Sequence, residues 1–95
     1  MKFIRNEELT GFCKMVGSNL RYLRTKRGWT QSKVGEPLNV RFQQIQKYEA
    51  GTNCPSAWRL KQLSNLFEVS PVDILDSGYI AKCCQQKEPD VPTLT

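Results

Sequence analysis

Apolar residues recur along the middle of the chain at the three- and four-residue spacing of amphipathic helices. The first such series predicts a helix over residues 16–27, and Gly28 follows as its stop (Val16, Leu20, Leu23). Thr30 offers an N-cap oxygen to a second predicted helix over residues 31–38. Pro37 lacks an amide hydrogen, so we expect this second helix to kink or to close early.

Three more helices are predicted further along. A third covers about residues 41–49 and stops at Gly51, and a fourth is capped by Ser56 and repeats apolar residues at i, i+3 and i+7 (Leu60, Leu63, Phe67). Ser70 and Pro71 open a short fifth helix carrying Ile74 and Leu75. The N-terminal residues 6–13 add a helical turn capped by Asn6. After Gly78 the pattern fades into a tail. The predicted fold class is therefore all-α.

The second and third helices have the pattern of two helices packed across a tight turn. Gly35 is small enough for them to cross closely, and Asn39 tolerates the left-handed conformation of a corner. The remaining positions form a wedge of core (Val34, Leu38, Val40, Ile45, Tyr48).

In order and spacing, residues 16–75 resemble the helix-turn-helix domain of the phage repressor and Cro family, also called the XRE family. The segments that carry the resemblance are VGSNLRYLRTKRGWTQ, NVRFQQIQKYEAGTNCPS and LKQLSNLFEVSPVDIL, and FQQIQKYEAGTN is similar to an alphaproteobacterial subset. The resemblance implies a five-helix, lambda-repressor-like DNA-binding domain, usually dimeric, that acts in transcriptional control. We expect a DNA-binding domain over residues 14–76, an N-terminal extension over 1–13 and a C-terminal tail over 77–95 that can add dimer contacts.

With Ile45 pointing inward, a helical step of 100° places Gln43 and Lys47 near the outer side, with Gln46 on a flank. Glutamine can bind adenine, and lysine can bind guanine, in the major groove. We therefore predict base reading by Gln43, Gln46 and Lys47. Phe42 lies on the rim, where contact with a thymine methyl group and packing against the core are both open.

Five polar residues around this helix are predicted to hold DNA phosphates, largely by the resemblance: Gln31, Arg41, Gln44, Thr52 and Asn53. Arg21 and Lys33 are weaker candidates. Glu49 points inward and needs a partner, which the family pattern places at Arg24, so we predict a structural ion pair. Trp29 is assigned to the core, and Trp58 is expected to be partly exposed.

Charge and composition agree with a polyanion-binding surface. The chain has 14 Lys and Arg against 9 Asp and Glu, a net charge of +5. The middle, residues 14–61, has ten cations against only Glu36 and Glu49, whereas the C-terminal third is mildly acidic. Such an uneven charge suggests one face that binds nucleic acid.

The spacing of the cysteines and the lack of histidine argue against a metal-binding protein and against an enzyme. Cys13, Cys54, Cys83 and Cys84 lack zinc-finger spacing, so we expect free thiols in a reducing cytosol, no metal and no cofactor. Without histidine, catalysis by Ser-His-Asp or Cys-His groups is excluded, and we expect no enzyme. We see no signal peptide and no apolar run long enough for a membrane, and we expect a cytoplasmic, nucleoid-associated protein.

The predicted function is sequence-specific binding to double-stranded DNA as a transcriptional repressor or a similar regulator. An antitoxin of a toxin–antitoxin pair, a restriction–modification controller or a prophage repressor without a sensor domain remain alternatives. A further alternative is a protein-interaction module that uses the same fold. The polar outer face of residues 42–47 argues against it, because such a module would need an apolar face there. We expect no ligand-sensing domain in the residues outside the helix-turn-helix. We expect a homodimer through apolar residues near the fifth helix (Leu66, Val72, Leu75, Tyr79, Ile80).

Overall fold

The structure, a computed structural model, describes residues 6–90 and the side chains of residues 6–84. Within this range the chain forms helices and no strand, which confirms the predicted all-α class: α1 (Asn6–Lys26), α2 (Gln31–Leu38), α3 (Phe42–Ala50), α4 (Ala57–Phe67), α5 (Pro71–Ile74) and α6 (Tyr79–Asp90). The outermost parts of the predicted extension and tail, residues 1–5 and 91–95, lie outside the described residues. None of the described helices is both long and apolar enough to cross a membrane.

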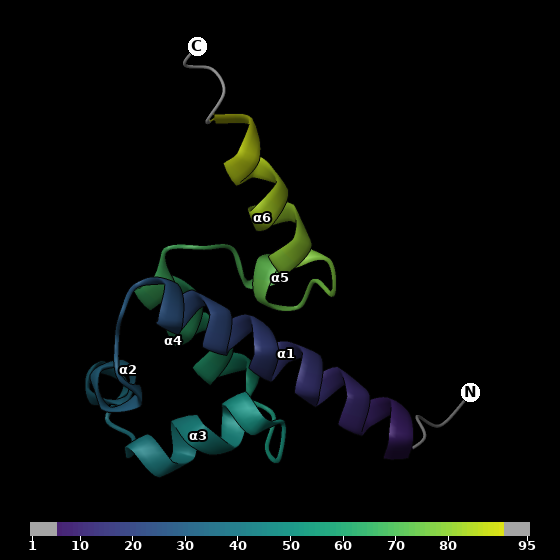
Figure 1. The fold of residues 1–95 in the computed structure, drawn as a ribbon. Coiled ribbons are helices and arrows are strands. Elements are labelled where there is room, and N and C mark those ends of the chain that lie inside the picture. The colour runs from purple at the N-terminus through teal and green to yellow at the C-terminus, as the bar shows by residue number, and fades with distance from the viewer. Residues whose placement is uncertain (1–5, 91–95) are drawn as a thin grey trace.

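The long helix α1 runs through the middle of the molecule, with α2 and α3 on one side of it and α5 and α6 on the other (Figure 1). One buried cluster joins the first five helices: Val16, Leu20, Leu23, Val34, Leu38, Ile45, Tyr48, Leu63, Phe67 and Ile74. Burial of apolar area of this kind is the main force that holds short helices together. The buried amide of Asn19 adds a polar tie, because its Nδ2 donates to the carbonyl oxygens of Ile74 and Asp76 at 2.8 and 2.9 Å.

The local signals in the sequence explain where the helices begin. Thr30 and Ser56 accept hydrogen bonds from the backbone N–H groups of Lys33 and Arg59, as N-caps do. Ser70 forms a reciprocal capping box with Asp73, with proline at the first helical position. The predicted starts of the second, fourth and fifth helices are therefore confirmed. The third helix starts one residue later than predicted, with Arg41 as its N-cap.

Two helices are longer than the sequence predicted. α1 is continuous from Asn6, and its first seven residues are exposed and project beyond the core (Figure 1). α6 occupies the segment after Gly78 that was expected to be a tail. Both segments lack a strong apolar stripe facing the core, so periodicity gave little signal. α2 runs to Leu38, so the expected early closure at Pro37 is wrong; the proline stands in the last turn, where one lost hydrogen bond matters little.

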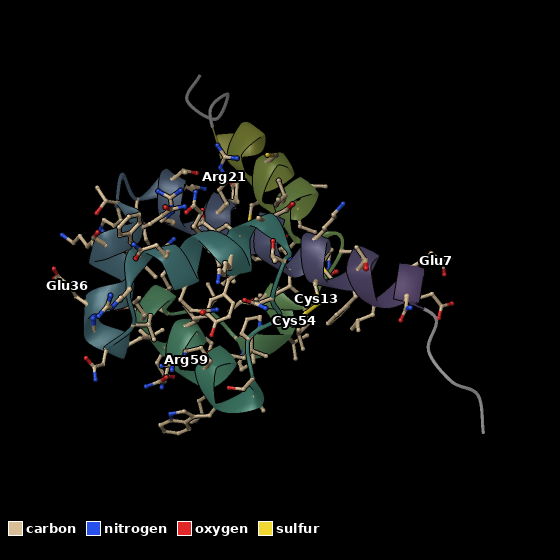
Figure 2. The ribbon with its side chains drawn as sticks, turned by 90° about the horizontal axis from the view of Figure 1, so that it is seen from below. Glu7, Cys13, Arg21, Glu36, Cys54 and Arg59 are labelled. Carbon is tan, nitrogen blue, oxygen red and sulfur yellow. A yellow bond between two sulfur atoms is a disulfide. The ribbon has the colours of Figure 1, made fainter. Side chains whose placement is uncertain are left out.

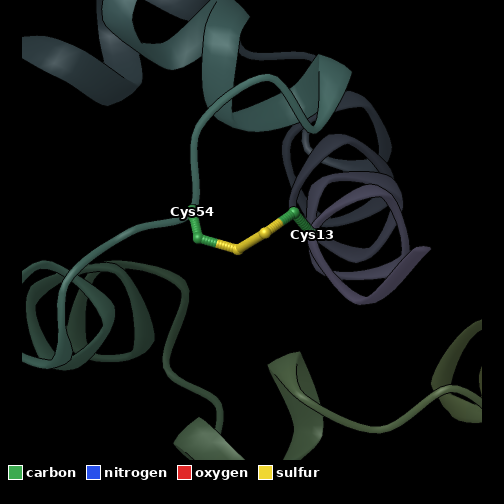
Figure 3. Close-up of a disulfide and its surroundings, with 2 residues drawn as sticks. All are labelled: Cys13 and Cys54. Carbon is green, nitrogen blue, oxygen red and sulfur yellow. A yellow bond between two sulfur atoms is a disulfide. The ribbon is translucent and has the colours of Figure 1, made fainter. Parts of the chain in front are cut away.

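The expectation of free thiols at Cys13 and Cys54 is also wrong. The two residues form a disulfide between α1 and the loop that follows α3, with their Cα atoms 5.3 Å apart (Figure 3). They are 41 positions apart in the sequence, and only the packing of α1 against α3 brings them together. Cys83 and Cys84 are free.

Candidate nucleic-acid interface

The corner between α2 and α3 has the geometry of a helix-turn-helix. Asn39 adopts the left-handed conformation (φ 60°), and its backbone N–H donates to the carbonyl of Glu36. A side chain at Gly35 would collide with the carbonyl oxygen of Val40 and touch Ile45. The two residues that the sequence assigned to the crossing and to the corner therefore have these roles, and they fix the angle at which α3 leaves the core.

α3 presents a polar face to solvent. Ile45 and Tyr48 are buried, whereas Gln43, Gln46 and Lys47 are exposed. Phe42 is 45 % exposed at the start of the helix, so it does not fold back fully onto the core. Arg41, the N-cap, is exposed and makes no side-chain capping bond. The helix thus offers amide and cationic groups on the outside, and within the described part of the chain none of these four polar side chains forms a hydrogen bond or an ion pair with a carboxylate.

An open depression of about 820 Å³ lies beside this face, at the start of α3 and under the loop that follows it. No carboxylate lines it, and its polar lining includes Arg41, Gln43, Gln44, Lys47, Asn53 and Arg59. Gln44 is half-buried, and its Nε2 lies 3.4 Å from Oδ1 of Asn53, which links the helix to the loop. Three cations around one concave surface make it electropositive and suited to a phosphate group.

The loop itself is held against the end of α3. Gly51 takes the left-handed conformation (φ 80°), and the backbone N–H groups of Thr52 and Asn53 donate to the carbonyl oxygen of Lys47. The side chains of Thr52 and Asn53 are exposed. Both residues predicted to hold phosphates in this loop therefore lie at the surface, next to the depression.

Arg24 and Glu49 form an ion pair behind α3. Nε of Arg24 donates to one carboxylate oxygen of Glu49 at 2.6 Å, Nη2 donates to the other at 2.9 Å, and Nη1 donates to the carbonyl oxygen of Trp29. The two side chains are only 14 % and 6 % exposed. The hydrogen bonds that the Arg24 guanidinium donates to the Glu49 carboxylate raise the pKa of Arg24. The pair ties the end of α1 to the end of α3.

Gln31 belongs to the same network. It stands at the start of α2, and its Nε2 donates to Glu49 at 3.1 Å, so its side chain is turned toward α3 and not freely into solvent. Of the weaker candidates, Arg21 is exposed on α1, and the ammonium of Lys33 lies 5.8 Å from the centroid of the Trp29 ring.

Arg59 was not among the predicted residues. It stands in the first turn of α4, and its Nη1 donates to the carbonyl oxygen of Leu38 and to the side chain of Gln62. Seen from the α3 side, Arg59 lies on the same side of α3 as Cys54 (Figure 2). Only the fold brings the start of α4 beside the turn between α2 and α3. In the sequence, the one sign that Arg59 could bind DNA was its position as a cation in the first turn of the helix that follows the loop.

The chain matches the family model described as helix-turn-helix over residues 20–74. It is 52 % identical over 54 residues, 57 % of this chain, to a protein of Sinorhizobium medicae named an uncharacterized HTH-type transcriptional regulator, of which the match covers 39 %. It is 33 % identical over 67 residues, 70 % of this chain, to the HTH-type transcriptional regulator ImmR of Bacillus subtilis, of which the match covers 53 %.

A third relative, from Rhodospirillum rubrum, is named an uncharacterized transcriptional regulator in the ATPase CF(0) region; it is 41 % identical over 58 residues, 61 % of this chain and 53 % of that protein. The chain thus spans about two fifths to one half of the length of these relatives. No solved structure shows significant similarity to it. From the matched residues and the turn geometry, the chain belongs to the XRE-type helix-turn-helix family of transcriptional regulators.

Proposed function

We propose that this chain binds double-stranded DNA in a sequence-specific way, with α3 in the major groove, and represses transcription. The observation that carries the proposal is the exposed face of α3, where Gln43, Gln46 and Lys47 point outward while Ile45 and Tyr48 pack into the core. A major groove admits one helix and offers paired donors and acceptors to such side chains.

In this proposal the residues divide into two groups. Gln43, Gln46, Lys47 and the rim residue Phe42 read base edges. Arg41, Gln44, Thr52 and Asn53 hold the phosphates beside α3, and Gln31 holds one at the start of α2 while its amide also supports Glu49. Contacts with phosphates fix the position of the protein, and contacts with bases supply the choice of sequence.

We further propose a two-fold homodimer. Val72 on α5 and Leu75, the residue that caps its end, are 69 % and 39 % exposed, and two neighbouring exposed aliphatic side chains can form the centre of an interface. Leu66 and Tyr79 pack partly against the core, so Val72 and Leu75 supply the larger part of the exposed apolar surface. A dimer would place two copies of α3 about 34–36 Å apart on a near-palindromic site. Sedimentation that shows only monomer at tens of micromolar, with and without DNA, would contradict it.

Two alternative roles, antitoxin and restriction–modification controller, would use the same DNA-binding surface. They differ from a simple repressor in a second partner, a toxin or a methyltransferase encoded nearby. Co-purification with the product of a neighbouring gene distinguishes them.

The test of DNA binding begins with selection of duplexes from a random pool near physiological salt. Gln43→Ala should weaken binding to the selected duplex by about 1–3 kcal/mol and leave binding to random duplex nearly unchanged, because a base contact is lost. Arg41→Ala should weaken both and reduce the slope of log K against log salt by about one unit, because a phosphate contact is lost.

Two variants on α4 serve as matched controls. Asn65→Ala removes an exposed amide and Lys61→Ala removes an exposed cation, and neither residue lines the depression. Both should bind like the unmodified chain. Failure to select any duplex would refute the proposed function. Equal losses on selected and random DNA for Gln43→Ala would show that Gln43 is not a base reader.

A further inference from the structure

The disulfide between Cys13 and Cys54 lies at a point where it can affect DNA binding. Cys13 is on α1 and only 7 % exposed, whereas Cys54 is an exposed residue in the loop between α3 and α4 (Figure 3). Cys54 follows Asn53 directly, and both residues line the electropositive depression beside α3. The disulfide therefore anchors one wall of the proposed phosphate site to α1.

The second half of this loop has few other anchors. At its start, Gly51 packs closely against the backbone of Lys14, and Thr52 and Asn53 bond to the carbonyl oxygen of Lys47. For Cys54 and Pro55 the structure records no hydrogen bond within its described range. The next fixed point is Ser56, which caps α4. Between Asn53 and Ser56 the disulfide is thus the main constraint on the path of the chain.

The disulfide lies outside the main buried cluster of the core. The buried cluster draws on α1 through α5 and contains neither cysteine. In addition, the ion pair of Arg24 with Glu49 and the close approach of Gly17 to the backbone of Tyr48 hold α1 against α3. Opening the disulfide should therefore release the loop and leave the helix-turn-helix folded.

We propose that the thiol–disulfide state of Cys13 and Cys54 regulates DNA affinity by fixing or releasing the loop that holds a DNA phosphate. The closed form already holds the segment between Asn53 and Ser56 in place beside the depression, so DNA binding does not have to order it. The open form must order this segment on binding and is weaker. This proposal rests on the proposed DNA-binding function.

The step that opens the disulfide is exchange with a dithiol reductant. One thiolate of the dithiol attacks the more accessible sulfur, that of Cys54, and forms a mixed disulfide. The Cys13–Cys54 bond breaks, and its electron pair leaves with Cys13 as a thiolate that takes up a proton from water. The second thiol of the dithiol then displaces Cys54, so the dithiol is oxidised to a disulfide and both cysteines are reduced. Oxidised glutathione, a disulfide oxidant, reverses the reaction and is itself reduced to two thiols.

The test measures the dissociation constant of the selected duplex after equilibration of the full chain with dithiothreitol or with oxidised glutathione, at one salt concentration. Thiol titration of the denatured protein should find two free thiols in the oxidised form, Cys83 and Cys84, and four in the reduced form. The reduced form should bind about three- to tenfold more weakly, which is the cost of ordering one or two loop side chains.

Two variants make the test specific. Cys13→Ser/Cys54→Ser should bind like the reduced chain under both conditions, and Cys83→Ser/Cys84→Ser should keep the full response. Circular dichroism of the reduced chain should show that it stays helical. Equal affinity in the two redox states, a chain that oxidised glutathione does not close, or a reduced chain that is unfolded would each overturn the proposal. In the first two cases the DNA-binding function survives, whereas no binding to any duplex in either state would refute that function itself.

Discussion

Removing the carboxylate of Glu49 should destabilise the domain strongly. This side chain receives two hydrogen bonds from Arg24, at 2.6 and 2.9 Å, and one from Gln31 at 3.1 Å, while only 6 % of it is exposed. Glu49→Ala leaves the guanidinium of Arg24, itself 14 % exposed, without its counter-ion. Breaking a buried pair in this way costs about 3–5 kcal/mol, and the residual exposure of Arg24 favours the lower value.

A loss of about 3 kcal/mol is a large share of the stability of a domain of this size, which is on the order of 5–14 kcal/mol. It should lower the melting temperature by roughly 12–24 °C, since 1 kcal/mol corresponds to about 4–8 °C in a domain of up to 100 residues. The assay is thermal and urea unfolding followed by circular dichroism, with the redox state of Cys13 and Cys54 held constant.

Glu36→Ala is the matched control, because Glu36 is an exposed carboxylate on α2 that points away from the molecule (Figure 2) and forms no side-chain hydrogen bond or ion pair within the described residues. Its effect should stay within about 0.5 kcal/mol. Arg24→Met/Glu49→Met, which leaves no charge unpaired, should be more stable than Glu49→Ala. If Glu49→Ala and Glu36→Ala melted at the same temperature, Glu49 would be solvated and the ion pair would contribute nothing.

Three further predictions concern packing and ionisation. Gly17→Ala should lower the free energy of unfolding in urea by about 1–3 kcal/mol, because the added Cβ would collide with the backbone of Tyr48. In the control Gly11→Ala on the same helix, the added Cβ meets no atom within 4 Å, so this variant should be more stable by about 0.5–1 kcal/mol. Equal effects would contradict the close crossing of α1 and α3. Asn19→Ala should cost about 1–3 kcal/mol by leaving buried carbonyl oxygens unpaired, and an unchanged urea midpoint would show that water replaces the amide. Burial, with a hydrogen bond to a neighbouring thiol, raises the pKa of Tyr79 to about 12. The protonated phenol therefore contributes its full stability below its ordinary pKa of about 10, and this contribution is lost as pH rises through about 12. Tyr79→Phe should remove the last step of the ultraviolet absorbance titration, and a titration of the unmodified chain without a late step would refute this.

The sequence by itself determined the elements that depend on a few neighbouring residues. Thr30, Ser56 and Ser70 mark helix starts because an N-cap oxygen satisfies an amide two or three residues away. Asn39 and Gly51 mark corners because they tolerate positive φ. The spacing of apolar residues also determined which side of α3 is buried, and the same ordered segments carried the resemblance to the XRE-type family.

Contacts between distant residues were decided by the tertiary structure. The disulfide of Cys13 with Cys54, and the position of Arg59 beside the turn between α2 and α3, depend on how three helices pack. α6 carries little periodic signal, and its start is supported by the ion pair of Lys82 with Asp76 and by the contact of Tyr79 with Tyr22.

The physical reason is the range of the interactions. A cap or a turn satisfies hydrogen bonds within one turn of chain, so its residues can be read in order. A disulfide or a carbonyl contact across helices requires a distance of a few ångströms between segments, and that distance is set by packing of the whole core.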